Sequence, residues 1–155
     1  PIVGALRAHV ARGGYGIGIC NGFQVLTETK ILPGALLRNA GQKFICRAET
    51  LRAEGDSLFA GAYGAGAEVV MPIAHHDGNY FADDATLDAL EGEGRVAFRY
   101  ADNPNGSARD IAGILSENKR VLGLMPHPER AVMPGDDKPA GTRLFAHLAG
   151  ALVAA

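Results

Sequence analysis

One short stretch decides the fold of this chain: Gly16–Gln24, which reads GIGICNGFQ. Its two glycines lie two residues before and two residues after Cys20. This Gly-x-Cys-x-Gly spacing is typical of a nucleophile elbow, in which a strand ends on the nucleophile and turns at once into a helix. We expect both glycines to be required because the backbone before the turn contacts the backbone after it.

The elbow interpretation also predicts chemistry at Cys20. A thiol at a helix N-terminus lies near amide dipoles that lower a cysteine pKa from its free value of about 8.5. The N–H of Asn21 would point to where a tetrahedral oxyanion forms. The alternative is a small buried residue that ends a core strand, because free cysteine is among the most buried residue types. The stretch alone leaves the two interpretations about equally strong.

Composition restricts the class of protein. The chain has 155 residues, 47% of them hydrophobic and 21% charged, with a formal net charge of -2. This is the composition of an ordinary globular domain with a real core. The net charge argues against nucleic acid or an anionic membrane as a partner. Two cysteines without metal-type spacing, and no apolar run of transmembrane length, predict a cytoplasmic protein.

The elements around the elbow indicate an α/β protein. Val3, Leu6 and Val10 share one helical face, and Gly13-Gly14 ends that helix. A strand over residues 15–19 then feeds the elbow and the helix that follows it. A helix, a strand, an elbow and a helix in this order form a piece of a parallel α/β sheet. We expect residues 1–155 to form a single domain.

The rest of the chain alternates strands and helices. Lys43–Glu49 alternates with period two, and we expect Phe44, Cys46 and Ala48 to face the core. Pro72 places the next strand at an edge or a bulge. The remaining expected elements are strands over 68–74 and 95–100, a hairpin of 111–115 with 121–125, helices over 82–91 and 142–153, and a loop over 134–141.

His127 is the best partner for Cys20. It follows the apolar run Val121–Met125 and lies between two prolines, which favour an extended backbone. Residues two apart in an extended chain project to the same side, so Glu129 would lie beside His127. A carboxylate on one imidazole nitrogen fixes the tautomer and leaves the other nitrogen to accept a thiol proton. The three residues together predict a Cys-His-Glu triad.

The cluster His75-His76-Asp77 could suggest a metal site. Adjacent histidines at the end of a strand point to opposite faces, however, so they rarely bind one ion. A loop that lines a substrate site, or a plain surface loop, fits better.

The motifs Gly18–Gln24 and His127-Pro128-Glu129 resemble the class I (triad) glutamine amidotransferases. The nearest group is the small glutaminase subunits of phosphoribosylformylglycinamidine synthase, an enzyme of purine biosynthesis. The resemblance covers nearly the whole chain. The further stretches that carry it are 32–39 (LPGALLRN), 74–80 (AHHDGNY), 103–107 (NPNGS), 111–114 (IAGI) and 125–130 (MPHPER).

The resemblance implies a three-layer, flavodoxin-like fold, with a central mostly parallel sheet and helices on both faces. It implies that Cys20 attacks the side-chain amide of glutamine, that His127 moves the proton and that Glu129 orients His127. The Asn21 N–H would form half of the oxyanion hole, and Gln24 would hold the amino-acid end of the substrate. The loop of His76, Asp77 and Gly78 would line the glutamine site.

The resemblance also implies partners and a leading segment. Ammonia would pass to an ATP- and Mg²⁺-dependent synthetase subunit, with a small third subunit as a bridge, and this chain would need no cofactor or metal of its own. We expect the N-terminal strands of the family, with a glycine-rich loop that supplies the second oxyanion donor, to be missing from the 155 residues. Loss of one such donor costs on the order of 10²–10³ in rate.

Two other interpretations remain open at the level of the sequence. The first is another elbow-cysteine hydrolase of the same fold superfamily. The second is a catalytically silent subunit that docks on or regulates a synthetase. Glutaminase activity that a synthetase partner stimulates argues against the first, and loss of glutamine-dependent synthesis in Cys20→Ala argues against the second.

Overall fold

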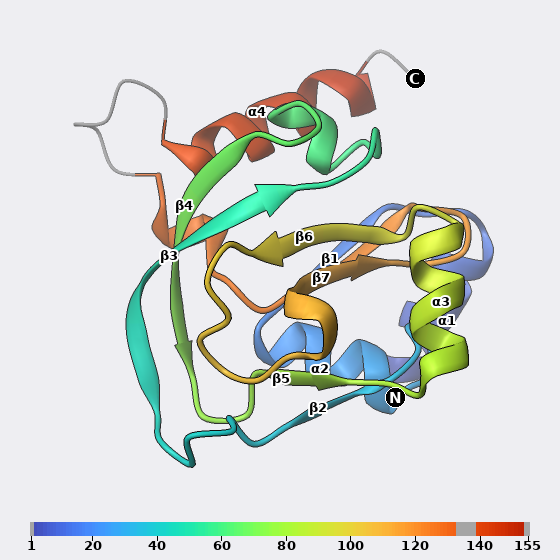
Figure 1. Cartoon of the computed structure of the whole chain (residues 1–155). Coiled ribbons are helices and arrows are strands. Elements are labelled where there is room, and N and C mark those ends of the chain that lie inside the picture. The colour runs from blue at the N-terminus through green and yellow to red at the C-terminus, as the bar shows by residue number, and fades with distance from the viewer. Residues whose placement is uncertain (1, 133–138, 154–155) are drawn as a thin grey trace.

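The computed structural model describes residues 2–132 and 139–153. Its helices and strands are interspersed along the chain, as in an α/β protein (Figure 1). In chain order they are α1 (Ile2–Ala11), β1 (Gly16–Ile19), α2 (Asn21–Glu28), β2 (Ala35–Leu37), β3 (Ile45–Ala53), η1 (Ala60–Ala62), β4 (Glu68–His75), β5 (Asn79–Phe81), α3 (Asp84–Gly92), β6 (Val96–Tyr100), η2 (Ala108–Asp110), β7 (Ile111–Leu115), β8 (Val121–Leu124), η3 (Pro128–Arg130) and α4 (Ala140–Val153).

The described strands form a six-stranded sheet in the order β1-β8-β7-β6-β3-β4 and a small second sheet of β2 and β5. The α/β fold with helices on both faces of the main sheet is confirmed. The strand directions differ from the expectation of a mostly parallel sheet, because β1 and β8 are parallel while the other four neighbouring pairs are antiparallel. The connection between β7 and β8 is a short hairpin, and a hairpin can join only antiparallel strands.

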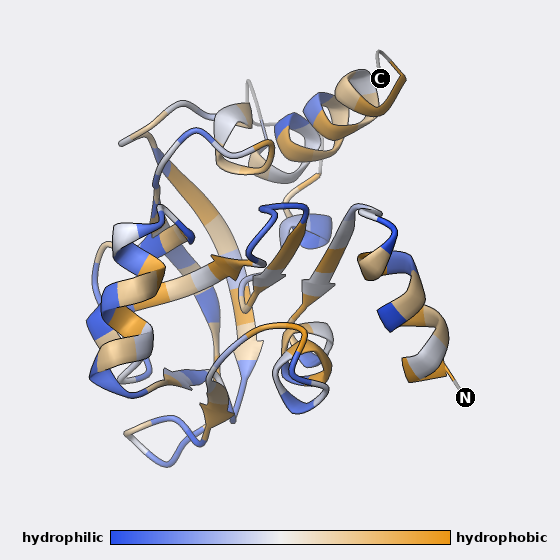
Figure 2. Ribbon diagram, turned by 90° about the vertical axis from the view of Figure 1, so that its right-hand side faces the viewer, coloured by the Kyte–Doolittle hydropathy of each residue, from blue (hydrophilic) through white to orange (hydrophobic). Residues whose placement is uncertain are grey.

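Two hydrophobic cores lie on opposite faces of the sheet. One contains Leu144 and Leu148 of α4 together with Phe59, beside η1. The other contains residues of α2 and α3, with α1 packed at its margin. Figure 2 shows the central strands as mostly hydrophobic and the helices as mixed. No helix in the described ranges is long and apolar enough to cross a membrane.

Most of the expected elements are confirmed within a few residues. Asp83 caps α3 by accepting a hydrogen bond from the Thr86 N–H at 2.7 Å, as a helix N-cap should. β4, which contains Pro72, is one of the two edge strands of the described six-stranded sheet, as expected. The loop expected over residues 134–141 falls mostly outside the described residues.

The expectation for the faces of β3 is wrong. Cys46 and Ala48 are exposed, and Phe44, just before the strand, is 61% exposed. The buried side chains of β3 have the opposite parity: Leu51 and Ala53 pack in the core with α4. Both faces of the strand carry apolar residues, so the alternation alone could not indicate which face the rest of the chain covers.

Candidate active site

Cys20 lies at a sharp turn between β1 and α2. Its backbone has φ 51° and ψ -106°, a left-handed conformation that side-chain-bearing residues rarely adopt. The turn is held from both sides, because the Cys20 N–H donates to the Leu124 carbonyl at 2.8 Å and the Cys20 carbonyl accepts from the Phe23 N–H at 2.9 Å. The predicted strand-turn-helix geometry is therefore present.

The two glycines of the elbow are not equivalent. A Cβ on Gly18 would lie 2.7 Å from the carbonyl carbon and oxygen of Gly22 and 2.4 Å from the Leu26 side chain. A Cβ on Gly22 would have no described neighbour within 4 Å other than the backbone of its own helix. The expectation that both positions must be small is correct for Gly18 and wrong for Gly22, because the close contact is made by the backbone of Gly22 and not by its Cα hydrogens.

The Cys20 thiol differs electrostatically from the expectation. Burial raises its pKa, the Asn21 backbone N–H lowers the pKa by a smaller amount, and the negative charge of Glu129 raises it. Desolvation therefore outweighs the helix N-terminus, and the thiol is protonated at neutral pH. A nucleophile in this state needs a base to remove its proton.

His127 and Glu129 lie side by side, at the end of β8. Nδ1 of His127 is 2.6 Å from Oε1 of Glu129. The predicted contact is present, but the backbone reaches it differently: Pro128–Arg130 forms the single 3₁₀ turn η3 instead of an extended segment. The backbone N–H of His127 donates to the Pro72 carbonyl of β4 at 2.8 Å, which fixes this turn to the edge strand β4.

One cavity of about 490 Å³ brings the predicted site residues together. Its lining includes Cys20 and His127 of the predicted triad and most of the predicted glutamine loop. The residues are Ile19, Cys20, Asn21, Gln24, Phe44, Ala74, His75, His76, Asp77 and His127. Gly78 is predicted at this site but lies behind it: its N–H and carbonyl bond to Asn39, Asn105 and Ser107.

Side chains from two segments, α2 and residues 38–39, hold the loop after β4. Gln24 of α2 donates to the Asp77 carbonyl at 3.0 Å. Asn39, fully buried, donates to the His75 carbonyl at 2.9 Å and accepts from the Gly78 N–H at 3.1 Å. Arg38 lies 3.5 Å from the Asp77 carboxylate. Sequence reasoning placed His75 in a loop that lines a substrate site or the surface, but it did not indicate Asn39, because the Asn39–His75 contact joins residues far apart in the chain.

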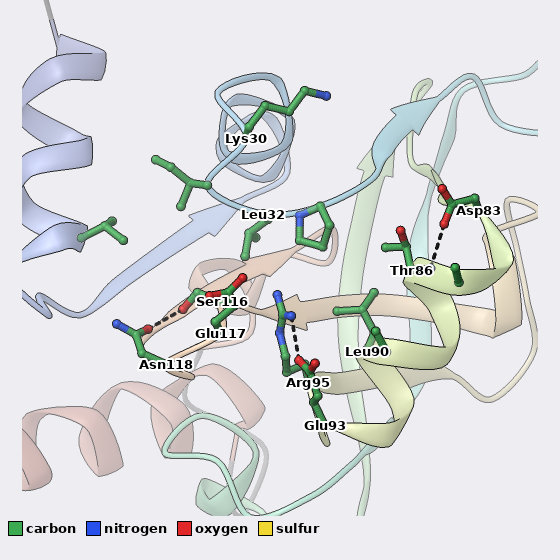
Figure 3. Close-up of a pocket in the computed structure, with 15 residues that line it drawn as sticks. Lys30, Leu32, Asp83, Thr86, Leu90, Glu93, Arg95, Ser116, Glu117 and Asn118 are labelled. Carbon is green, nitrogen blue, oxygen red and sulfur yellow. Dashed lines mark hydrogen bonds and ion pairs between the residues drawn. The ribbon is translucent and has the colours of Figure 1, made fainter.

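A second and larger cavity, of about 830 Å³, lies between α3, the end of α2 and the β7–β8 hairpin (Figure 3). Its polar groups are largely bonded to one another. Arg95 pairs with Glu93 at 2.9 Å, and Ser116 bonds to Asn118 at 2.7 Å. It contains neither cysteine nor histidine among its lining residues. The predicted Cys20–His127 pair lies in the smaller cavity, which we therefore take as the candidate active site.

The described part of the chain also holds no group of three or more His, Cys, Asp or Glu side chains placed to bind a metal ion. His76 lies 4.0 Å from the Asp77 carboxylate, and its Nε2 is 3.4 Å from the Gln42 carbonyl. His75, His76 and Asp77 all line the cavity that contains Cys20.

The CobB/CobQ-like glutamine amidotransferase domain matches residues 1–140 of the chain. The chain belongs to this amidotransferase family. Within the family it is similar to the phosphoribosylformylglycinamidine synthase subunit PurQ of Ruegeria pomeroyi, with 62% identity over 100% of this chain and 70% of the relative. The PurQ subunit of Cereibacter sphaeroides is 63% identical over 98% of this chain and 69% of its own length.

The amidotransferase fold is matched in solved structures as well. The structure of PurLQS from Thermotoga maritima superposes with a TM-score of 0.86 at 38% identity, over 97% of this chain and 68% of that chain. The family relation therefore rests on sequence and on structure together.

Proposed function

We propose that this chain is the glutaminase component of a phosphoribosylformylglycinamidine synthase. It hydrolyses glutamine to glutamate and ammonia, and a synthetase subunit uses the ammonia to convert formylglycinamide ribonucleotide to the amidine. One observation carries the proposal: a chain 62% identical to a PurQ subunit places Cys20, on a strained elbow, and His127, paired with Glu129, around one cavity.

The reaction begins with proton transfer from the Cys20 thiol to Nε2 of His127. The thiolate attacks the side-chain amide carbon of glutamine, and the Asn21 N–H stabilises the resulting oxyanion. The C–N bond then breaks, its electron pair stays on nitrogen, and His127 returns the proton so that ammonia leaves. Water, deprotonated by His127, hydrolyses the remaining glutamyl thioester to glutamate and the Cys20 thiol.

Glu129 acts on this cycle through His127. A carboxylate 2.6 Å from Nδ1 keeps the proton on Nδ1 and leaves Nε2 as the base. It also stabilises the imidazolium that exists between the two proton transfers. The raised pKa of Cys20 makes this base necessary, because little thiolate is present at neutral pH without it.

We extend the proposal to the surroundings of the site. Gln24, His76 and Asp77 contact the amino-acid end of glutamine, and Gly78 shapes their loop. The chain binds no cofactor of its own, since ATP and Mg²⁺ belong to the synthetase subunit, and a small third subunit bridges the two. The assembly works in the cytoplasm, where a free thiol nucleophile stays reduced. The name of the PurLQS structure from Thermotoga maritima supports an assembly of this kind.

The test is intact-mass labelling with a diazo-ketone analogue of glutamine, performed on the full-length subunit assembled with its synthetase partners. We expect one adduct on the wild-type subunit and none on Cys20→Ser. Retained glutamine-dependent synthesis in Cys20→Ala would refute the proposal in favour of a silent docking subunit. Glutamine turnover that the synthetase does not stimulate would favour a different elbow hydrolase.

A further inference from the structure

The hydrogen bonds around Asn39 determine the tautomer of His75. The side-chain NH₂ of Asn39 donates to the carbonyls of Lys43 at 2.8 Å and His75 at 2.9 Å, so its other atom, Oδ1, is the acceptor. Oδ1 accepts from the Gly78 N–H at 3.1 Å and lies 3.0 Å from Nδ1 of His75. Nδ1 therefore carries the proton, and Nε2 of the neutral ring carries the lone pair.

The His75 ring is also held in place by packing. A Cβ on Gly78 would lie 2.3 Å from Nδ1 and 2.4 Å from Cε1 of His75, so the Gly78 backbone rests against the ring. His75 is 4% exposed, and burial lowers its pKa to about 4. The ring is therefore neutral at pH 7, with one fixed orientation and one lone pair.

That lone pair has no hydrogen-bond partner within the described residues, although Nε2 is buried. A buried acceptor without a donor costs free energy, and such groups recur where a ligand completes the bonding. Nε2 of His127 is in the same condition. Both rings line the cavity that contains Cys20, and they are close enough for the charge of His127 to lower the pKa of His75.

We propose that Nε2 of His75 accepts one N–H of the glutamine side-chain amide and thereby orients the leaving nitrogen toward His127. In the tetrahedral adduct that nitrogen has two N–H groups and one lone pair. Holding one N–H on His75 turns the lone pair toward the protonated Nε2 of His127. The proton then passes to nitrogen as the C–N bond breaks, and ammonia leaves. This inference rests on the proposed glutaminase function.

The experiment compares glutamine with the γ-methyl ester of glutamate, whose leaving oxygen carries no hydrogen to donate. Two variants separate the two ring nitrogens of His75. His75→Asn keeps an amide near the place of Nδ1, within reach of Asn39, and removes the acceptor at Nε2. His75→Gln places an amide oxygen near Nε2 and gives up the bond to Asn39. Both are assayed in the full-length subunit assembled with its synthetase partners.

We expect His75→Asn to lose roughly tenfold in kcat/KM with glutamine, the value of about one hydrogen bond, and to hydrolyse the ester within about twofold of wild type. His75→Gln should recover most of the loss with glutamine. Ester turnover by His75→Asn at close to the wild-type rate would also show that the variant site is folded.

Equal losses with glutamine and with the ester would overturn the inference and assign His75 a purely structural role. A His75→Gln variant as impaired with glutamine as His75→Asn would overturn it as well. Failure of the proposed function looks different, because the wild-type assembly would then hydrolyse neither substrate.

Discussion

The elbow and the β3–β4 ribbon each carry one of the two cysteines, and their local environments are opposite. Cys20 sits on a strained turn, where bonds to Leu124 and Phe23 fix the backbone. Cys46 lies on an exposed face of β3, although its strand alternates as a core strand does. An elbow is specified by steric contacts within a few residues. Which side of an alternating strand is buried depends on helices far away in the chain.

Replacing the two cysteines one at a time gives the largest effect in this comparison. Cys20→Ala removes the atom that forms the thioester, and we expect glutaminase turnover to fall at least 1,000-fold, as for other covalent nucleophiles. Cys46→Ala should leave turnover within about twofold of wild type. Ammonia release by the assembled complex measures both. Equal loss in the two variants would mean that the exposed ribbon takes part in the chemistry.

The two faces of β3 should differ next most strongly, in stability. Leu51 is fully buried, and Leu51→Ala should lower the free energy of unfolding by about 3 kcal/mol through lost burial and a cavity. Phe44, which lies just before β3 with the opposite parity, is 61% exposed, and Phe44→Ala should change the free energy of unfolding by less than about 0.5 kcal/mol. Urea denaturation measures both. A large cost at Phe44 would indicate that another part of the full-length protein covers this face.

The two glycines of the elbow provide a smaller contrast. Gly18→Ala forces a Cβ against the Gly22 carbonyl, and we expect a loss of about 2 kcal/mol in the free energy of unfolding. Gly22→Ala meets open space within α2, so it should be neutral or stabilise by up to about 1 kcal/mol. Equal costs from urea denaturation would contradict the close approach of the two backbone segments at Gly18.

Sequence reasoning succeeded where a pattern is local. Glycine spacing located the turn at Cys20, and turn residues and periodicity located the hairpin and the helix that Asp83 caps. It placed Glu129 beside His127, although the segment forms a 3₁₀ turn instead of an extended one.

Sequence reasoning failed where the answer depends on contacts between distant segments. The orientation of β3 and the directions of most strand pairs are set by such contacts. The bond between Asn39 and His75 joins residues 36 positions apart, and no spacing within either segment indicates it. The direction of the Cys20 pKa shift is a similar case, because helix position is visible in the sequence whereas desolvation is not.

That pKa shift gives the smallest predicted effect and decides between two physical causes. Burial raises the Cys20 pKa, so its thiolate fraction at pH 7 is lower than that of an unperturbed thiol, and it rises only at alkaline pH. Each single variant keeps one cysteine, Cys20 in Cys46→Ala and Cys46 in Cys20→Ala. At pH 7 we expect iodoacetamide to alkylate the remaining Cys20 several-fold more slowly than the remaining Cys46. The rate for Cys20 should have its midpoint above the ordinary thiol pKa.

Adding Glu129→Gln to Cys46→Ala tests the cause of this shift, because it removes a negative charge that raises the Cys20 pKa. The midpoint should move to lower pH while remaining above the ordinary value, since burial is the largest cause. Intact mass spectrometry at a series of pH values measures the rates. A midpoint below the ordinary thiol value in the Cys46→Ala parent would mean that the helix N-terminus outweighs desolvation. Cys20 would then ionise without His127, and the need for a base in the first step would disappear.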